Sequence, residues 1–461
     1  MTSLRQIHRG FLRVAASSNP ANNQTYEIGK VLGGKWDQGY EVKFGDNFIP
    51  APLRWSVFQK DWLTGGFNPQ DWFAADGTPD GRPLKPEELP MNRVAEAKCN
   101  GCHTTGFQFA KDKESSVWKA QGKGELGVAC ESCHGPGSRH ADEAKAAKAA
   151  GAKLAVGTST IVNPLKDLNP EQATQICAQC HGRGTNKNQT ELTFPTGFLP
   201  GDMDIAGRYR FWNLSSTSAK NESDNFWSND WAARNRQQWQ DFTKSAHYTK
   251  ADMSCITCHA FHGKSADAQL RKKPAELCAD CHTATGRAKR PNVEMFEGSI
   301  MQESGVVCSD CHMARIGSRS RKTAKSGHQW DTSAHSMFVA SPLLEKERGV
   351  RSSCTECHGG KLNVRGKIMP SGEQTKTYTL DDMTDRAAQR AAYIRTSIDE
   401  AQQLLGSVKS KRPEAAALVD KANSKINFVL LDNSKGAHNY LRAKKLIEEA
   451  NKLAAEAAGM K

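Results

Sequence analysis

Paired cysteines followed by histidine dominate the chemistry that this sequence offers. Cys130-Glu131-Ser132-Cys133-His134 reads C-x-x-C-H, and the same pattern occurs seven times. Such a stretch attaches a c-type haem, because the two thiols form thioethers with the porphyrin and the histidine binds the iron. The cysteines expected to carry haem are Cys99, Cys102, Cys130, Cys133, Cys177, Cys180, Cys255, Cys258, Cys278, Cys281, Cys308, Cys311, Cys354 and Cys357. The expected proximal ligands are His103, His134, His181, His259, His282, His312 and His358.

Zinc knuckles are the main alternative for paired C-x-x-C stretches. Zinc ribbons use knuckles two at a time, whereas this chain has seven, and a ribbon does not require histidine after the second cysteine. With 14 histidines in 461 residues, one such placement has a chance of about 3%. The pattern therefore predicts seven covalently bound haem c groups, and it leaves no cysteine for a disulfide or a reactive thiol.

The composition indicates how such haems are positioned. Only 38% of the residues are hydrophobic and the mean hydropathy is −0.65, which is a thin apolar core for a chain of this length. Porphyrins supply the missing apolar surface. We expect a mainly α fold with extensive loop, in which a stack of haems forms the core.

Three regions are expected along the chain. Residues 1–98 hold no cysteine and predict a cap with short β-hairpins, since apolar residues alternate after Gly33–Tyr40. Residues 99–380 form the seven-haem domain, which includes an aromatic-rich insert between the third and fourth motifs that we expect to serve packing. In residues 381–461 the apolar period becomes helical and predicts antiparallel helices, one of them starting near Pro413.

Seven histidines lie outside the motifs, one for each expected iron. They are His8, His140, His247, His262, His328, His335 and His438, and all are candidate distal ligands. His140 and His262 follow their motifs too closely to cross their own porphyrin, so they would serve neighbouring haems. His328 and His335 are seven residues apart, so one of the two is expected to ligate.

Much of residues 25–262 resembles exported multihaem cytochromes c related to cytochrome c-554. The resemblance rests on GGKWDQGY (Gly33–Tyr40), CNGCHTTGF (Cys99–Phe107), GVACESCHGPGSRH (Gly127–His140), IVNP (Ile161–Pro164), CAQCHGRG (Cys177–Gly184), FPTGFLPGD (Phe194–Asp202) and SAHYTKADMSCITCHAFH (Ser245–His262). Similarity to this family implies that His140, His247 and His262 are distal ligands.

The segment Lys435–Asn439 looks like the Gly-x-His-Asn distal-ligand segment of the group that contains nitrite reductase and octahaem cytochromes. The nitrite reductases of that group carry a C-x-x-C-K haem, which this chain lacks, so nitrite reduction at the visible motifs is not expected. Relatives also place another C-x-x-C-H just before the part resembling Ser3–Phe11. We therefore hypothesise that the natural protein has a signal peptide and an eighth haem upstream of Met1.

Charge and hydropathy limit the partners. The net charge is +13 at pH 7, but the haem propionates offset it and the lysines and arginines are scattered, so nucleic-acid binding is not expected. No stretch approaches 18 consecutive apolar residues, so no transmembrane segment is expected. Covalent haem attachment takes place outside the cytoplasm, which predicts an exported, periplasmic or extracellular protein whose partners are redox proteins, other cytochromes among them.

The preferred function is electron transfer through closely spaced haems with two histidine ligands each. One alternative is an oxidoreductase in which one iron lacks a distal histidine and acts on a small nitrogen or sulfur compound. In that case His8, His328 or His335 would be unligated. Another alternative is a homo-oligomer, the subunit of a conducting cytochrome filament. The sequence assigns no catalytic residue and leaves enzyme activity open.

Overall fold

The computed structural model describes most of the chain. The described residues are 4–8, 10–14, 19–34, 37–57, 60–64, 68–74, 81–89, 93–111, 118–121, 124–154, 160–202, 204–215, 225–263, 267–318, 322–323, 330–358 and 378–460. The chain divides into two compact units, the first formed by residues 1–257 and 316–336 and the second by residues 258–315 and 337–461. This division falls within the fourth motif, and the three regions expected from the sequence remain a prediction.

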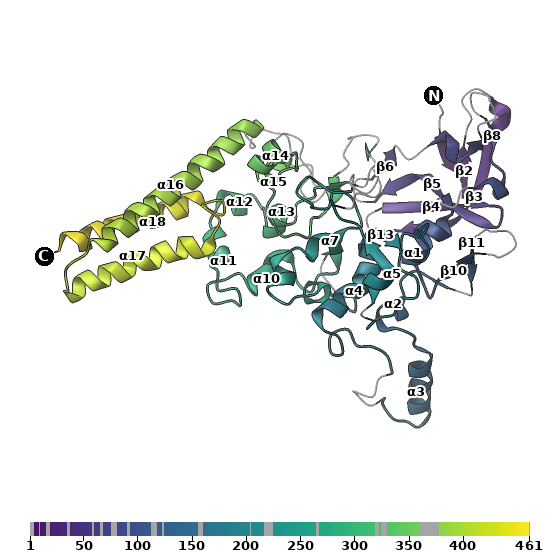
Figure 1. Ribbon diagram of the computed structural model, residues 1–461, viewed down its shortest axis with the longest axis horizontal. Helices are drawn as coiled ribbons and strands as arrows, with labels where there is room; N and C mark the ends of the chain where they lie inside the picture. Colours follow the sequence, from purple (N-terminus) through teal and green to yellow (C-terminus); the bar gives the residue numbers. More distant parts are fainter. Residues whose placement is uncertain are drawn as a thin grey trace. The chain divides into compact units, whose positions relative to one another are not determined.

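An antiparallel sheet forms one end of the first unit (Figure 1). Neighbouring strands are consecutive along the chain except for the last pair: β1 (Leu4–His8), β2 (Phe11–Val14), β3 (Gln24–Gly33), β4 (Asp37–Phe44), β5 (Asn47–Ser56), β6 (Asp61–Thr64) and β16 (Lys322–Thr323). Leu12, Val42, Ile49 and Trp72 are fully buried on it. This sheet is larger than the short hairpins expected, because β16 arrives from far along the sequence and β5 continues through two prolines.

The remaining elements of the first unit are short. Its two-stranded sheets are β7 (Phe73–Ala74) with β8 (Arg82–Pro83), β9 (Thr104–Thr105) with β12 (Glu125–Leu126), β10 (Gln108–Lys111) with β11 (Trp118–Gln121), β13 (Gly184–Asn186) with β14 (Tyr209–Phe211), and β15 (Gly317–Ser318) with β17 (Trp330–Thr332). Its helices are η1 (Pro20–Asn22), η2 (Pro69–Asp71), η3 (Pro86–Glu88), η5 (Glu96–Asn100), α1 (Gly101–His103), α2 (Glu131–His134), α3 (Ser138–Ala149), α4 (Pro170–His181), α5 (Ile205–Arg208), α7 (Gln238–Phe242) and α8 (Ala246–Thr249). A further turn, α9 (Cys255–Cys258), ends at the division between the units.

The second unit is helical in its described part. Short helices come first: η6 (Asp267–Gln269), α10 (Pro274–Ala279), α11 (Asn292–Phe296), α12 (Ile300–Glu303), α13 (Cys308–His312), α14 (Pro342–Arg348) and α15 (Ser353–His358). Three long helices then lie side by side (Figure 1): α16 (Leu380–Gly406), α17 (Pro413–Asp432) and α18 (Tyr440–Gly459). Their shared core includes Ile394, Ile426 and Ile447.

Local signals set the ends of these helices. Thr379 and Asp382 form a capping box at the start of α16, and Pro413 occupies the first turn of α17 as expected. Asn433 ends α17 in the left-handed conformation, with φ 55°. Asn439 then caps α18. Within the described part of the chain, no helix is both long and apolar enough to cross a bilayer.

Candidate functional site

The motif cysteines lie on or beside short helical turns. The first motif begins in η5 and continues in α1, the second lies in α2, and the third occupies the last turn of α4. The sixth and seventh motifs lie in α13 and α15, the cysteines of the fourth lie in α9, and the fifth begins in α10 and continues beyond its end. A helical turn brings residues three apart to the same side, so each pair of thiols faces one region of space with the histidine beside it. All fourteen thiols are free of disulfides.

Five motif histidines share one hydrogen-bonding arrangement. Nδ1 lies 2.7 Å from Val162 O in His134, 3.0 Å from Ala268 O in His259, 3.1 Å from Met337 O in His312, 3.1 Å from Asn292 Oδ1 in His282 and 3.3 Å from Gln238 Oε1 in His181. A carbonyl oxygen accepts a hydrogen bond and cannot donate one, so Nδ1 carries the proton. Nε2 then carries the lone pair that a metal requires, which is the usual arrangement of histidine ligands.

The charge state of the motif histidines also suits iron. Burial lowers the pKa of His103, His181 and His312, which favours the neutral imidazole that binds a metal. Just after the third motif, Arg183 lies near Arg234 and Arg236, and burial together with these two neighbours lowers the pKa of Arg183 to about 9. A cluster of guanidinium groups suits the propionates of a haem. The residues present therefore fit covalently attached haem.

The third motif touches its neighbours in the first unit. The Cys102 and Cys180 side chains are within hydrogen-bonding distance of each other, and so are those of Cys177 and Cys255. Gln179, between the cysteines of the third motif, donates from Nε2 to Ser132 O of the second motif at 3.1 Å. The first, second and fourth motifs thus all adjoin the third.

Thiols are also adjacent in the second unit. The side chains of Cys278 and Cys308 are within hydrogen-bonding distance, which places the fifth motif against the sixth. Cys278 also lies near Cys258 of the fourth motif. Cys311 of the sixth motif lies near Cys354 and Cys357 of the seventh. Because porphyrins would be attached to these sulfurs, the haems of adjoining motifs would be close neighbours.

The aromatic-rich insert packs against the third motif. Phe211 and Trp239 stack with ring centroids 3.7 Å apart, and Tyr209 meets Phe211 edge-on. This cluster includes Ala178, which is fully buried between the two cysteines of the motif. Trp212 donates from Nε1 to Thr185 Oγ1 at 2.9 Å. The described aromatic residues thus support the expectation that the insert serves packing.

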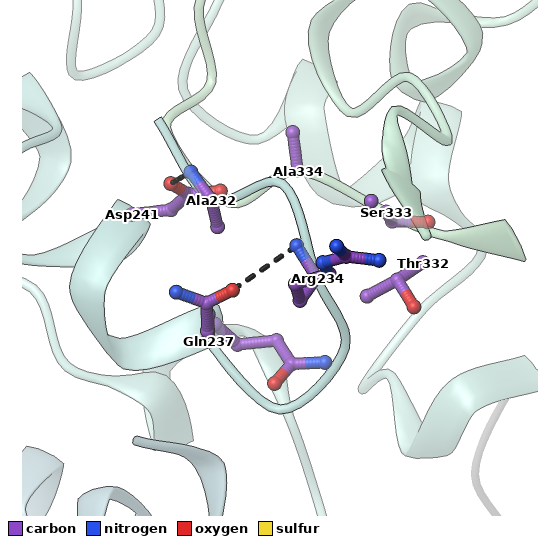
Figure 2. Close-up of a pocket in the computed structure, with 9 residues that line it drawn as sticks. Ala232, Arg234, Gln237, Asp241, Thr332, Ser333 and Ala334 are labelled. Carbon is purple, nitrogen blue, oxygen red and sulfur yellow. Dashed lines mark hydrogen bonds between the residues drawn. The ribbon is translucent and has the colours of Figure 1, made fainter. Parts of the chain in front are cut away.

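His335 is held by buried polar groups in the first unit. Its backbone N–H donates to Asp241 Oδ2 at 3.2 Å, and its Nδ1 lies 3.1 Å from Ser333 O. Figure 2 shows the neighbouring slot, where Asp241 accepts from Ala232 N and Gln237 accepts from Arg234 N. No part of this slot is wide enough for a water molecule. The slot therefore fixes the segment that carries His335 and is not a substrate pocket.

His438 faces the histidine of the sixth motif. The ring centroids of His312 and His438 are 6.0 Å apart. Two imidazoles on opposite sides of one iron have centroids about 6 Å apart, because each metal–nitrogen bond is about 2 Å long. His438 Nδ1 lies 2.6 Å from Asp432 Oδ1, and this carboxyl group is almost fully buried. Burial alone would raise the pKa of Asp432, but the hydrogen bonds, led by that of His438, outweigh it and lower the pKa.

The other distal candidates are placed as follows. His140 lies on α3 and lines, with His134, a cavity of about 350 Å³ beside the second motif. His247 lies on α8, whose first turn is capped by Ser245, and His262 is exposed just after the fourth motif. His8 ends β1, and its side chain is outside the described part. His328 also lies outside the described residues, so the choice between His328 and His335 stays open.

Glu41 is a fully buried carboxyl group near Cys99 of the first motif. Lys30 Nζ lies 3.6 Å from Glu41 Oε2 and 3.6 Å from Glu96 Oε1, too far for hydrogen bonds. Burial raises the pKa of Glu41 to about 7, with Lys30 opposing the shift and Glu96 adding to it. A carboxyl group that is partly protonated at neutral pH therefore adjoins the first motif.

We expect Glu41→Gln to stabilise the protein at pH 8. The pKa is about 7 in the folded state against an ordinary value of 4.5, so the unfolded chain binds fewer protons between these values and stability falls as pH rises through them. Removing the charge should raise the free energy of unfolding by about 3 kcal/mol at pH 8. Urea unfolding at pH 5 and pH 8 measures this. The exposed Glu27→Gln on β3 is the matched control, and an equal effect of Glu41→Gln at both pH values would contradict the expectation.

Sequence reasoning missed the residues that hold the imidazoles. Asn292 and Asp432 are 140 positions apart, yet both contact histidines of the expected haem sites. The sequence contains no signal for this pairing. Gln238, beside His181, lies in the insert, where only the aromatic residues had suggested a role.

Family profiles match three parts of the chain. The profile of cytochrome c552 matches residues 279–460, that of the doubled C-x-x-C-H motif matches residues 247–287, and that of cytochrome c554 and c-prime matches residues 83–135. These matches confirm both resemblances noted in the sequence. A comparison with curated proteins gave no significant match.

Solved structures of cytochromes align with most of the chain. The outer cell wall cytochrome OcwA is 21% identical with a TM-score of 0.63, and the alignment covers 94% of this chain and 88% of OcwA. The undecahaem cytochrome from the S-layer of Carboxydothermus ferrireducens is 15% identical with a TM-score of 0.48, covering 93% of this chain and 62% of the other. The similarity to OcwA shows that the two chains share a fold.

Proposed function

We propose, from the premise that this chain is a multihaem c-type cytochrome, that it carries electrons along seven closely spaced haems with two histidine ligands each. Electron transfer is the role common to such proteins, and the haem number, the ligation and the site of action are our proposal. The observation that carries it is the pair of His312 and His438, whose ring centroids lie 6.0 Å apart, the separation expected for two imidazole ligands of one iron.

The chain's own residues hold and orient the ligands. Bound haem supplies one-electron chemistry, and two imidazoles suit it because neither oxidation state needs a new ligand. Backbone carbonyls of Val162, Ala268 and Met337 fix three motif histidines by accepting their Nδ1 protons. Such fixed rings limit rearrangement when an electron arrives, which favours fast transfer.

Adjoining motifs support the proposed electron path. In the first unit the third motif meets the first, second and fourth, and in the second unit the sixth motif meets the fifth and seventh. This continuity suits a carrier that passes electrons between partners. We propose redox proteins, other cytochromes among them, as those partners.

The proposed location is outside the cytoplasm, either periplasmic or extracellular. The reason is the chemistry of thioether formation, which cells perform after export. An eighth haem upstream and assembly into a homo-oligomer or filament remain hypotheses from the sequence. Electron microscopy at several protein concentrations tests the filament, and dispersed particles at every concentration count against it.

Low-temperature electron paramagnetic resonance of the oxidised protein tests the proposed ligation, with haem content measured on the same sample. Seven haems per chain and low-spin ferric signals alone are expected. A stoichiometric high-spin signal that changes on adding nitrite, hydroxylamine or cyanide would instead establish an open iron. That outcome would replace the carrier by an oxidoreductase acting on a small nitrogen or sulfur compound.

A further inference from the structure

A chain of hydrogen bonds connects histidines of the fifth and sixth motifs in the second unit. His282 Nδ1 lies 3.1 Å from Asn292 Oδ1, and Asn292 Nδ2 donates to Asp432 Oδ1 at 3.1 Å and to Asp432 O at 2.7 Å. The same Asp432 Oδ1 accepts from His438 Nδ1 at 2.6 Å. Asn292 and Asp432, which we call the ligand bridge, therefore join His282 to His438.

The end of α17 builds this bridge. Asp432 is the last residue of α17, and the left-handed turn at Asn433 brings the chain back so that His438 lies beside it. Ser434 donates to Asp432 Oδ2 from both its backbone N and its hydroxyl group, and its Oγ accepts from His438 N at 3.2 Å. Both the carboxylate and the ring are therefore fixed before any ligand binds.

The two histidines meet acceptors of different charge. Asp432 is 4% exposed and, among the described residues, no lysine or arginine forms an ion pair with it. A carboxylate that accepts from Nδ1–H makes the imidazole a stronger electron donor, and this stabilises ferric over ferrous iron. The amide oxygen of Asn292, beside His282, is neutral, so it strengthens electron donation by that imidazole less than a carboxylate would.

We propose that Asp432 is a positioning residue that acts through His438 to keep the reduction potential of the sixth-motif haem below that of the fifth-motif haem. Asn292 ties the two ligand sets together. The inference rests on the proposed function, in which His438 is the distal ligand facing His312. Because the Cys278 and Cys308 side chains are in contact, the two haems adjoin, and such a difference would give electron flow between them a preferred direction.

Asp432→Asn tests the role of the charge, because asparagine keeps the size and an acceptor oxygen. We expect the reduction equilibrium constant of one haem to rise about tenfold, which corresponds to about 59 mV for one electron. Potentiometric titration followed by electron paramagnetic resonance measures the shift, and all haems should stay low-spin. Exposed Asp420→Asn on the same helix removes an equal charge away from His438 and should leave every potential unchanged.

Ser434→Ala supplies a test of opposite sign with Asp432 in place. Losing the hydroxyl donor leaves more negative charge for His438, so the same potential should fall. Unchanged potentials in both variants would overturn the inference. A high-spin haem in Asp432→Asn would also overturn it, because it would show that the carboxylate only orients the ring. Failure of the proposed function would appear differently, as a high-spin signal in the unaltered protein.

Discussion

Replacing His438 with alanine is expected to convert one of seven haems from low-spin to high-spin iron. The His312 and His438 centroids are 6.0 Å apart, the separation of two axial imidazoles, and alanine leaves one side of the iron without a nitrogen ligand. Electron paramagnetic resonance should then show a high-spin signal from about one-seventh of the total haem, with a matching change in the visible spectrum.

Two companion variants separate ligation from helix stability. Asn439 accepts from Arg442 N at 3.1 Å as the cap of α18, so Asn439→Ala should cost about 1 kcal/mol of stability while all haems stay low-spin. His438→Met supplies another ligand and should restore the low-spin state with a potential raised by about 0.1 V, a fraction of the ~0.8 V that axial ligands span. A spectrum unaffected by His438→Ala would remove this residue from the ligand set.

The motifs could be predicted from the sequence because both thiols and the histidine lie within five residues. The same holds for the C-terminal helices, whose burial follows a local period. Ile394, Ile398 and Ala401 recur at the helical period on α16, and all three are buried. The expected start near Pro413 is the observed start of α17. Local patterns of this kind are encoded within one or two turns.

The arrangement of motifs in space could not be predicted, because it depends on contacts between distant segments. Order along the chain suggests only that the first motif adjoins the second, and the hydroxyl oxygens of Thr105 and Ser132 do lie 2.7 Å apart there, but Cys102 also meets Cys180 of the third. The number of strands in the sheet was underestimated for a related reason. Pro50 and Pro52 argue against a strand, but β5 accommodates them while pairing with β4, and β16 joins only through long-range pairing.

The third motif adjoins the first, second and fourth motifs. Its Cys180 adjoins the first motif, its Gln179 bonds to the second and its Cys177 adjoins the fourth. Described contacts therefore connect the first two motifs to the fourth through the third. A haem at this position would link the first two motifs to the fourth through the contacts of the described residues.

Removing the third haem should separate the remaining six into two groups. In the double variant Cys177→Ala/Cys180→Ala we expect six haems per chain and slow electron exchange between the haems of the first two motifs and the others. Transfer slows steeply with distance, and among the described residues no contact joins the first or second motif directly to the fourth. Haem content and redox equilibration after flash photoreduction measure the two effects, and slow and fast phases should have amplitudes of about two and four haems.

The matched control removes a haem from the end of the path. Cys354→Ala/Cys357→Ala also leaves six haems, but the seventh motif is described next to the sixth alone, so the remaining haems stay connected. This variant should equilibrate in a single fast phase. If both variants equilibrate equally fast, the third haem is not the link, and the adjacency of the thiols does not define the electron path. A slow phase in Cys177→Ala/Cys180→Ala alone would show that electrons pass through the haem attached at Cys177 and Cys180.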